Sequence, residues 1–221
     1  MADQISTASL DLSKLRTDYQ KRSLTEAEVD PDPLRQFTVW MNEAVAADVH
    51  EPTAMTLATC TSDRLPSARI VLLKGVEDGR FVFFTNYLSR KGRELDENPK
   101  AALVFFWPEL ERQVRITGDV TLTSAAESDA YFASRPPASR IGAVASAQSE
   151  PIASREILEQ RVRGLQSRFP DGNISRPAGW GGYCVKPVQI EFWQGRPSRL
   201  HDRIEYLLDA SGKWAIRRLA P

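Results

Sequence analysis

The sequence has few of the residues that build metal sites, disulfides or strongly charged surfaces. Its 221 residues include two cysteines and two histidines, and Lys+Arg and Asp+Glu each number 29. Cys60 and Cys184 lie in strand-like stretches without a nearby Cys or His, so they read as buried hydrophobic residues. His50 and His201 are far apart, which argues against a metal site. The zero net charge disfavours nucleic acid as a partner.

Long apolar runs and common catalytic motifs are also missing. The longest apolar runs, such as residues 101–107, are far shorter than the about 20 residues of a membrane-spanning helix. Residues 1–15 lack the apolar core of a secretory signal, so we expect a cytoplasmic protein without a membrane partner. No Gly-x-Ser-x-Gly elbow, Gly-Lys-Ser/Thr phosphate loop or dinucleotide fingerprint is present. Difficult chemistry would therefore need an organic cofactor.

The periodicity predicts an α+β fold that is mainly β. Strands are expected over residues 54–61, 67–74, 80–86, 100–107, 112–123, 183–194, 201–208 and 214–219. Helices are expected over residues 10–21, from the Asp32 cap onward, over 89–98, after the Ser124–Glu127 capping box and over 154–169. Core-facing residues should include Leu34, Phe37, Trp40, Met41, Val45, Val114, Ile116, Val120 and Leu122. Because no crossover helices separate the strands, an antiparallel barrel with peripheral helices is favoured over a doubly wound sheet.

Three groups of side chains combine cations, hydroxyls and aromatic rings. The first, the strand group, runs from Arg69 to Lys74 and continues with Thr85 and Ser89-Arg90-Lys91. Strand cations followed by a basic helix start suit a phosphate. By pattern alone, the same residues more simply indicate a solvated strand edge and an exposed basic pair. Since Arg69 and Lys74 are an odd number of residues apart, a regular strand would point them to opposite faces unless a bulge intervenes.

The second group, the helix-end group, contains Tyr131, Arg135, Ser139 and Arg140. A phenol, a guanidinium and a hydroxyl again suit a phosphate. Tyr131 and Arg135 share a helix face if the helix reaches Arg135, although Pro136 is expected to end it. A helix C-terminus with a favourable Arg at its negative end explains the same pattern.

The third group, the C-terminal group, contains Trp193, Arg196, Arg199, His201 and Arg203. A Trp beside several cations and a His could line a planar heteroaromatic ligand. The alternatives are a packed core Trp193 and a neutral His201 that is hydrogen-bonded in a turn.

Taken together, the three groups resemble the pyridoxine/pyridoxamine 5′-phosphate oxidase family. The resemblance runs from about Arg16 to Pro221 and rests on many ordered segments. These are DPL (32–34), EPTAM (51–55), RIVLLK (69–74), FTN (84–86), SRK (89–91), ERQV (111–114), YFASRP (131–136), QS (148–149), WGG (180–182), IEFWQG (190–195) and RLHDR (199–203).

The resemblance implies an FMN-binding split β-barrel and a homodimer with active sites at the subunit interface. It implies a flexible segment at residues 1–30 and one oxidase domain at 31–221. The FMN-binding residues carried over are Arg69, Ile70, Val71, Leu72, Leu73, Lys74, Phe84, Thr85, Arg90, Lys91, Gln113, Gln148, Ser149, Trp193 and Arg203. The substrate-binding residues carried over are Arg16, Tyr19, Lys74, Tyr131, Arg135, Ser139, Arg199 and His201.

The implied reaction is the oxidation of pyridoxamine 5′-phosphate and pyridoxine 5′-phosphate to pyridoxal 5′-phosphate. A hydride passes from C4′ to FMN, and O2 then accepts the electrons to give H2O2, with ammonia released from the amine. Arg199 and His201 are the expected catalytic residues because they would orient the pyridine ring, and no metal is expected. Two alternatives remain: another split-barrel flavin or deazaflavin reductase, and a non-catalytic carrier of FMN or pyridoxal phosphate.

Overall fold

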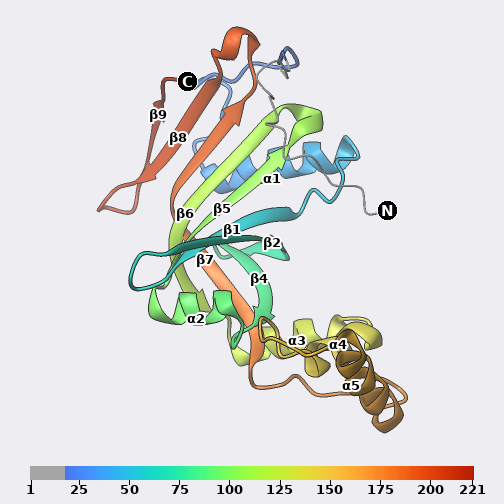
Figure 1. The fold of residues 1–221 in the computed structure, drawn as a ribbon. Helices are drawn as coiled ribbons and strands as arrows, with labels where there is room; N and C mark the ends of the chain where they lie inside the picture. The colour runs from blue at the N-terminus through green and yellow to red at the C-terminus, as the bar shows by residue number, and fades with distance from the viewer. Residues whose placement is uncertain (1–17) are drawn as a thin grey trace, which may run out of the picture.

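The structure is a computed structural model that describes residues 18–221 (Figure 1). Its helices are α1 (Pro33–Ala46), α2 (Arg90–Glu97), α3 (Ala125–Ser134), α4 (Pro137–Ala145), α5 (Arg155–Arg168) and the short 3-10 turns η1 (Pro108–Leu110) and η2 (Pro197–Arg199). Its strands are β1 (Ala54–Cys60), β2 (Pro66–Leu72), β3 (Gly75–Glu77), β4 (Arg80–Asn86), β5 (Lys100–Trp107), β6 (Arg112–Leu122), β7 (Trp180–Gln194), β8 (Asp202–Leu208) and β9 (Trp214–Arg218).

The strands form one curled antiparallel sheet in the order β2-β1-β5-β6-β7-β4-β3, and β8 and β9 extend it from β7. The long strand β7 pairs with β6 along most of its length. Its first part pairs with β4 through residues 180–185, and its last part pairs with β8 through residues 189–194. The register of β6 and β7 shifts between Thr117 and Gly118. The sheet therefore divides along β7 into two parts, and the predicted mainly β, antiparallel fold with peripheral helices is confirmed.

The core lies on one face of the sheet, where α1 packs (Figure 1). The Phe37 ring meets Phe105 and Phe81 with ring centroids 5.1 and 4.9 Å apart, and Trp40 meets Phe192 at 5.1 Å. Alternation along β6 buries Val114, Ile116 and Val120 on this face, as predicted. Because side chains alternate along a strand, the opposite face carries the second set of residues of each strand.

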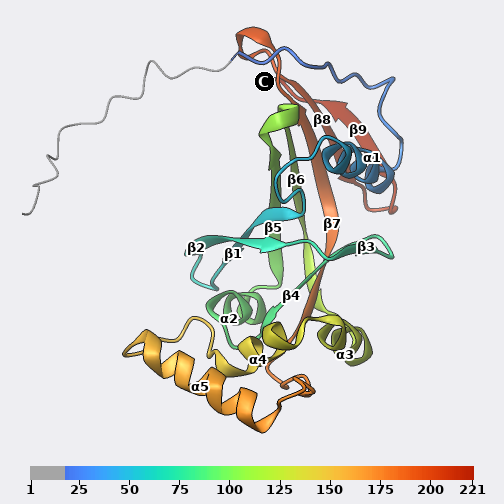
Figure 2. The ribbon, with the colours of Figure 1, turned by 90° about the vertical axis from the view of Figure 1, so that its right-hand side faces the viewer.

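The helices start at the predicted signals. The Asp32 side chain caps α1, the Ser89 side chain accepts from the Gly92 N–H of α2, and Ser124 and Glu127 form the capping box of α3. Figure 2 shows α3, α4 and α5 gathered at the end of the sheet that lies away from the C-terminus. None of the helices in the described part of the chain is long and apolar enough to cross a membrane.

Several local predictions are wrong. Residues 18–21 of the predicted first helix are not helical, and residues 10–17 of it lie outside the described residues. Val45 and Leu122 are 56% and 58% exposed, because each lies at the end of its element, beyond the packed core. A separate helix α4, which follows Pro136, was not foreseen. There the fixed φ of Pro137 starts a new helix directly after Pro136 ends α3.

Residues 18–30 carry no helix or strand and lie along the domain. Leu24 and Val29 are buried, and the Leu24 N–H donates to Asp202 at 3.1 Å. The Tyr206 hydroxyl donates to the Asp30 carbonyl at 2.6 Å. These contacts attach the segment to β8, and the division of the chain at residue 30 stays a prediction.

Candidate active site

A cleft of about 1040 Å³ lies between β2, β4 and the helices α2, α3 and α4. It brings the strand group and the helix-end group together, although they lie far apart in the sequence. Fourteen of the predicted site residues line it: Arg69, Ile70, Val71, Leu72, Lys74, Phe84, Thr85, Arg90, Lys91, Tyr131, Arg135, Ser139, Gln148 and Ser149.

The geometry of the chain after β2 explains how Arg69 and Lys74 reach the same cleft. Strand β2 ends at Leu72, so the alternation stops before Lys74. The Leu73 N–H still donates to Thr53 beside β1, whereas the Lys74 N–H donates to Val82 of β4. The Leu73 side chain turns into the core and does not line the cleft, whereas the other residues of 69–74, which were also predicted to bind FMN, do line it.

Lys91 forms the centre of a possible anion site at the start of α2. Its side chain is 7% exposed. Its Nζ lies 3.2 Å from Thr85 Oγ1, 3.3 Å from Ser89 Oγ and 3.2 Å from Gln148 Oε1. Among the described residues, no carboxylate forms an ion pair with it. Burial, followed by the nearby Arg69 charge, lowers the pKa of Lys91, while Glu94 opposes the shift. A buried cation with only neutral partners is costly, and an anionic ligand would offset that cost.

Glu94 organises the two arginines beside this site. The carboxylate is 2% exposed and lies 3.1 Å from Arg69 Nη2 and 2.9 Å from Arg90 Nε. Burial raises the pKa of Glu94, but hydrogen bonds from Ser67, Thr59, Arg90 and Arg69 outweigh it and lower the pKa to about 2. Both Nη atoms of Arg69 already have protein partners. The Arg69 guanidinium is therefore not free to grip a phosphate, and Arg69 serves as part of the cleft wall.

Arg135 forms a second possible anion site in the same cleft. Helix α3 ends at Ser134, so Arg135 is its C-cap rather than part of the helix. Its Cζ lies 4.8 Å from the centroid of the Trp180 ring, and its buried Nη1 has no hydrogen-bond partner among the described residues. Burial lowers the pKa of Arg135, and Tyr131 opposes the shift. An unpartnered guanidinium nitrogen in a cleft suits a ligand oxygen.

Aromatic rings lie beside Arg135. The Tyr131 ring stacks on Phe84 with centroids 3.9 Å apart and an interplanar angle of 15°, and Trp180 lies nearly parallel to both. This arrangement gives the cleft a flat apolar wall beside the second anion site.

Three predicted FMN-binding residues lie elsewhere, in one row across the sheet. Gln113 of β6 pairs with Trp193 of β7, which pairs with Arg203 of β8, so their side chains share a face. Arg203 binds Glu191 in a bidentate pair at 2.8 and 3.1 Å and donates to Ala220 at 2.8 Å. This pairing raises the pKa of Arg203. Its guanidinium is therefore largely engaged within the chain.

His201 lies next to this row. Its ring is 4.6 Å from Trp193 between centroids, and Tyr19 packs edge-on against both rings. His201 Nδ1 accepts the Arg196 N–H at 3.1 Å, so a neutral ring carries its proton on Nε2. Burial and the neighbouring Arg199 charge lower the pKa of His201. His201 is thus hydrogen-bonded in a turn, which is the alternative to a ligand-binding role that the sequence offered for it. Arg199 is exposed, and its backbone is left-handed with φ 63°.

The row and the cleft lie at opposite ends of β7. Trp180 lines the cleft at the start of the strand, and Trp193 belongs to the row near its end. At about 3.3 Å per residue this stretch spans roughly 40 Å along the strand. Figure 2 shows β7 running from the helical end of the molecule to the opposite end. One chain therefore does not bring Gln113, Trp193, Arg199, His201 and Arg203 to its own cleft, and Arg16 lies outside the described residues.

Sequence reasoning missed two residues that shape the cleft. Trp180 belongs to the WGG segment, but the sequence suggested no role for it. Its ring lies under the Arg135 guanidinium. Glu94 is a carboxylate in a basic helix start, and its position four residues after Arg90 is the signal that could have identified it.

Known families and relatives match this chain along most of its length. Residues 41–169 match the family model described as pyridoxamine 5′-phosphate oxidase, and residues 180–221 match the pyridoxine 5′-phosphate oxidase C-terminal dimerisation region. A pyridoxine/pyridoxamine 5′-phosphate oxidase of Cyanothece sp. is 56% identical over 96% of this chain and 100% of its own length. That of Trichormus variabilis is 58% identical over 95% of this chain and 98% of its own length.

Solved structures show the same fold. PhzG from Burkholderia lata, in complex with tetrahydrophenazine-1-carboxylic acid, has a TM-score of 0.85 at 31% identity, covering 90% of this chain and 98% of that one. An FMN-binding protein of Nostoc punctiforme, related to pyridoxamine 5′-phosphate oxidase, has a TM-score of 0.71 at 20% identity, covering 87% and 100%. The fold is thus the predicted split barrel. Since a family model matches more than half of the chain and relatives match nearly all of it, the chain belongs to the pyridoxine/pyridoxamine 5′-phosphate oxidase family.

Proposed function

We propose that this protein oxidises pyridoxamine 5′-phosphate and pyridoxine 5′-phosphate to pyridoxal 5′-phosphate, with FMN as cofactor and O2 as electron acceptor. The observation that carries the proposal is a pair of cations in one cleft: the buried Lys91 and the half-buried Arg135, whose Nη1 is buried. Neither forms an ion pair with a carboxylate of the described residues, so the cleft has a place for two phosphate groups. The names of the 55–58% identical relatives support the same reaction.

FMN fits the residues around Lys91. Lys91, Thr85, Ser89 and Gln148 supply a cation, two hydroxyls and an amide around one point, and the N-terminus of α2 adds its dipole. These residues would hold the FMN phosphate. Bound FMN supplies a hydride acceptor that O2 reoxidises with formation of H2O2. Arg69, held by Glu94, and residues 70–72 would line the wall along the cofactor.

The substrate phosphate fits the residues around Arg135. The unpartnered Arg135 Nη1 would donate to a phosphate oxygen, with Lys74, Tyr131 and Ser139 contributing further contacts from the cleft wall. Holding the phosphate fixes one end of the substrate, and such positioning can supply on the order of 7–11 kcal/mol of the barrier.

A second copy of the chain would complete the site. The C-terminal dimerisation region supports a homodimer. The sheet face opposite the core is open in one chain and exposes Ile70 and Phe106, which are 64% and 53% accessible. Phe106 pairs with Gln113 and so belongs to the same row as Trp193 and Arg203. Pairing of this face would bury apolar surface and bring the row of one copy to the cleft of the other.

Arg199 and His201 would act from beside that row. The neutral His201 ring offers Nε2–H as a donor, and the exposed Arg199 guanidinium offers a cation. We infer that they bind the polar substituents of the pyridine ring and set the C4′ carbon against the flavin. Neither residue needs to form a covalent bond to the substrate.

One assay tests this function against its alternatives. The purified protein should carry a flavin spectrum, and pyridoxamine 5′-phosphate added under air should give pyridoxal 5′-phosphate and H2O2 in equal amounts. Flavin binding without product would indicate a carrier. Flavin reduction only by a nicotinamide or a deazaflavin would indicate a reductase. Turnover of a reduced phenazine but not of the vitamin phosphates would indicate an activity related to that of the PhzG structure.

A further inference from the structure

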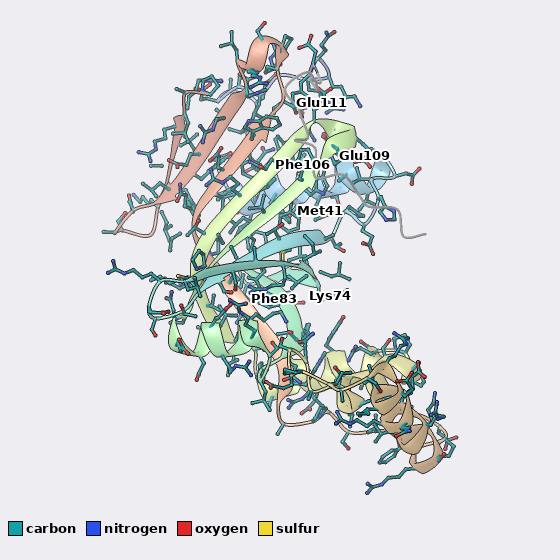
Figure 3. The ribbon with its side chains drawn as sticks, in the orientation of Figure 1. Met41, Lys74, Phe83, Phe106, Glu109 and Glu111 are labelled. Atoms are coloured by element: carbon teal, nitrogen blue, oxygen red, sulfur yellow. The ribbon has the colours of Figure 1, made fainter. Side chains whose placement is uncertain are left out.

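The connection between β5 and β6 holds the start of the described chain through one side chain. Glu111 follows η1, is buried and has a left-handed backbone with φ 55°. Its Oε2 accepts the backbone N–H groups of both Gln20 and Lys21, each at 3.0 Å. The Lys21 Nζ also donates to the Glu109 carbonyl. Figure 3 shows Glu109 and Glu111 together at the end of the sheet where the described chain begins.

Tyr19 directly precedes the two anchored amides and packs onto the C-terminal group. Its ring meets Trp193 at 5.6 Å and His201 at 5.8 Å between centroids, edge-on in both cases. Gly195 makes room for it, because a Cβ at this position would lie 2.7 Å from Tyr19 Cγ. The Gly195 N–H donates to the Glu111 carbonyl at 2.8 Å. Glu111 thus fixes both the segment that carries Tyr19 and the glycine on which Tyr19 lies.

We propose that Glu111 is a positioning residue for the substrate site, acting through Tyr19. The inference rests on the proposed function, in which His201 contacts the substrate, and on the expected substrate-binding role of Tyr19, whose ring packs against His201. A carboxylate that accepts two backbone N–H groups makes charge-assisted hydrogen bonds, which are stronger than neutral ones. They hold the residues next to Tyr19 before any ligand arrives. Binding then loses less conformational entropy at this segment.

Two variants and a control separate the anchor from the rest of the turn. Glu111→Ala removes both acceptor contacts, whereas Glu111→Gln keeps an acceptor oxygen without the charge. Glu109→Ala is the control, because the Glu109 side chain makes no hydrogen bond or ion pair to the described residues and its carbonyl is retained.

The first readout does not depend on activity. Hydrogen exchange of the Gln20 and Lys21 amides in the full-length protein should be about tenfold faster in Glu111→Ala, because hydrogen bonds to a charged group are lost. Glu111→Gln should show a smaller increase, and Glu109→Ala should match the wild type. Unchanged exchange in Glu111→Ala would overturn the anchor whether or not the protein oxidises vitamin phosphates.

The second readout tests the path through Tyr19. Glu111→Ala should raise KM for pyridoxamine 5′-phosphate by about as much as Tyr19→Ala, and the double variant should be no worse than either. If the fold increases in KM of the two single variants multiply in the double variant, Glu111 acts without Tyr19. If Glu111→Ala does not fold, Gly195→Ala displaces Tyr19 sterically and should raise KM, and an unchanged KM there would contradict the proposal.

Discussion

The Lys91 ammonium lies 3.2 Å from Gln148 Oε1, and this contact joins the start of α2 to the loop that follows α4. Thr85 Oγ1 lies 3.0 Å from the same amide oxygen. The strand group and the segment after the helix-end group therefore meet around one buried charge. Within residues 18–221 this charge has hydroxyl and amide partners but no carboxylate partner, which makes Lys91 the most direct place to test cofactor binding.

Lys91→Met should weaken FMN binding by about 10–100-fold, because one charge-assisted contact to the phosphate is lost. The apoprotein should lose no stability, since the substitution removes a desolvated charge and retains a flexible side chain. Titration of the apoprotein with FMN, followed by quenching of flavin fluorescence, measures the affinity. Lys213→Ala, in the exposed turn before β9, is the matched control. Equal affinity of Lys91→Met and the wild type would remove Lys91 from the cofactor site.

Glu94→Gln should lower the free energy of unfolding at pH 7 by about 3 kcal/mol, since the folded pKa of about 2 lies well below the ordinary 4.5. A carboxylate with a lowered pKa stabilises the fold above pH 4.5, and this contribution is lost as the pH falls towards 2. The gap between wild type and variant should therefore close over that range. Urea unfolding at several pH values measures it, with the exposed Asp96→Asn on the same helix as control. A gap that is independent of pH would contradict the ion-pair network around Glu94.

Arg135→Ala should raise KM for pyridoxamine 5′-phosphate about tenfold or more and leave the flavin spectrum intact, because the guanidinium is assigned to the substrate phosphate and not to FMN. The unphosphorylated amine should be affected much less. Steady-state rates with both amines measure the difference, and Arg155→Ala, whose side chain is exposed on α5, is the control. A similar change for both amines would indicate that Arg135 does not bind the phosphate.

His201 should titrate below pH 6.5, because burial and Arg199 lower its pKa. The neutral ring is the form that accepts the Arg196 N–H, so this contribution to stability is complete above pH 6.5 and declines as the pH falls through the folded pKa. We expect the acid limb of kcat/KM to follow the same titration. NMR of the imidazole protons measures it, and a His50→Gln variant assigns the two histidine signals. A His201 pKa above 6.5 would contradict the assigned hydrogen bond.

Local signals in the sequence located most of the fold. The Asp32 and Ser89 caps, the Ser124–Glu127 capping box and the alternation in β6 each depend on neighbouring residues, and the structure has them as predicted. Errors occurred where packing or chain ends decide the outcome. Val45 continues the helical pattern of α1, but it lies in the last turn and is 56% exposed.

The site was harder to predict because its residues come together only through tertiary structure. Spacing alone points Arg69 and Lys74 to opposite faces, and the change of hydrogen-bonding partner between Leu73 and Lys74 resolves the conflict. Sequence also cannot show that β7 carries Trp180 and Trp193 to opposite ends of the molecule. The residues assigned to one site thus fall into two places on each chain, which a site shared by two copies would reconcile.

Mixed dimers test that shared site most directly. Arg135→Ala removes a residue of the cleft, and Arg199→Ala removes a residue of the C-terminal group, so each variant alone should have little activity at low substrate concentration. Co-expression of both variants should restore about a quarter of the wild-type rate, since about half of the dimers are mixed and each mixed dimer has one intact site of two. No activity above that of the separate variants would show that each chain builds its site alone and would contradict the account.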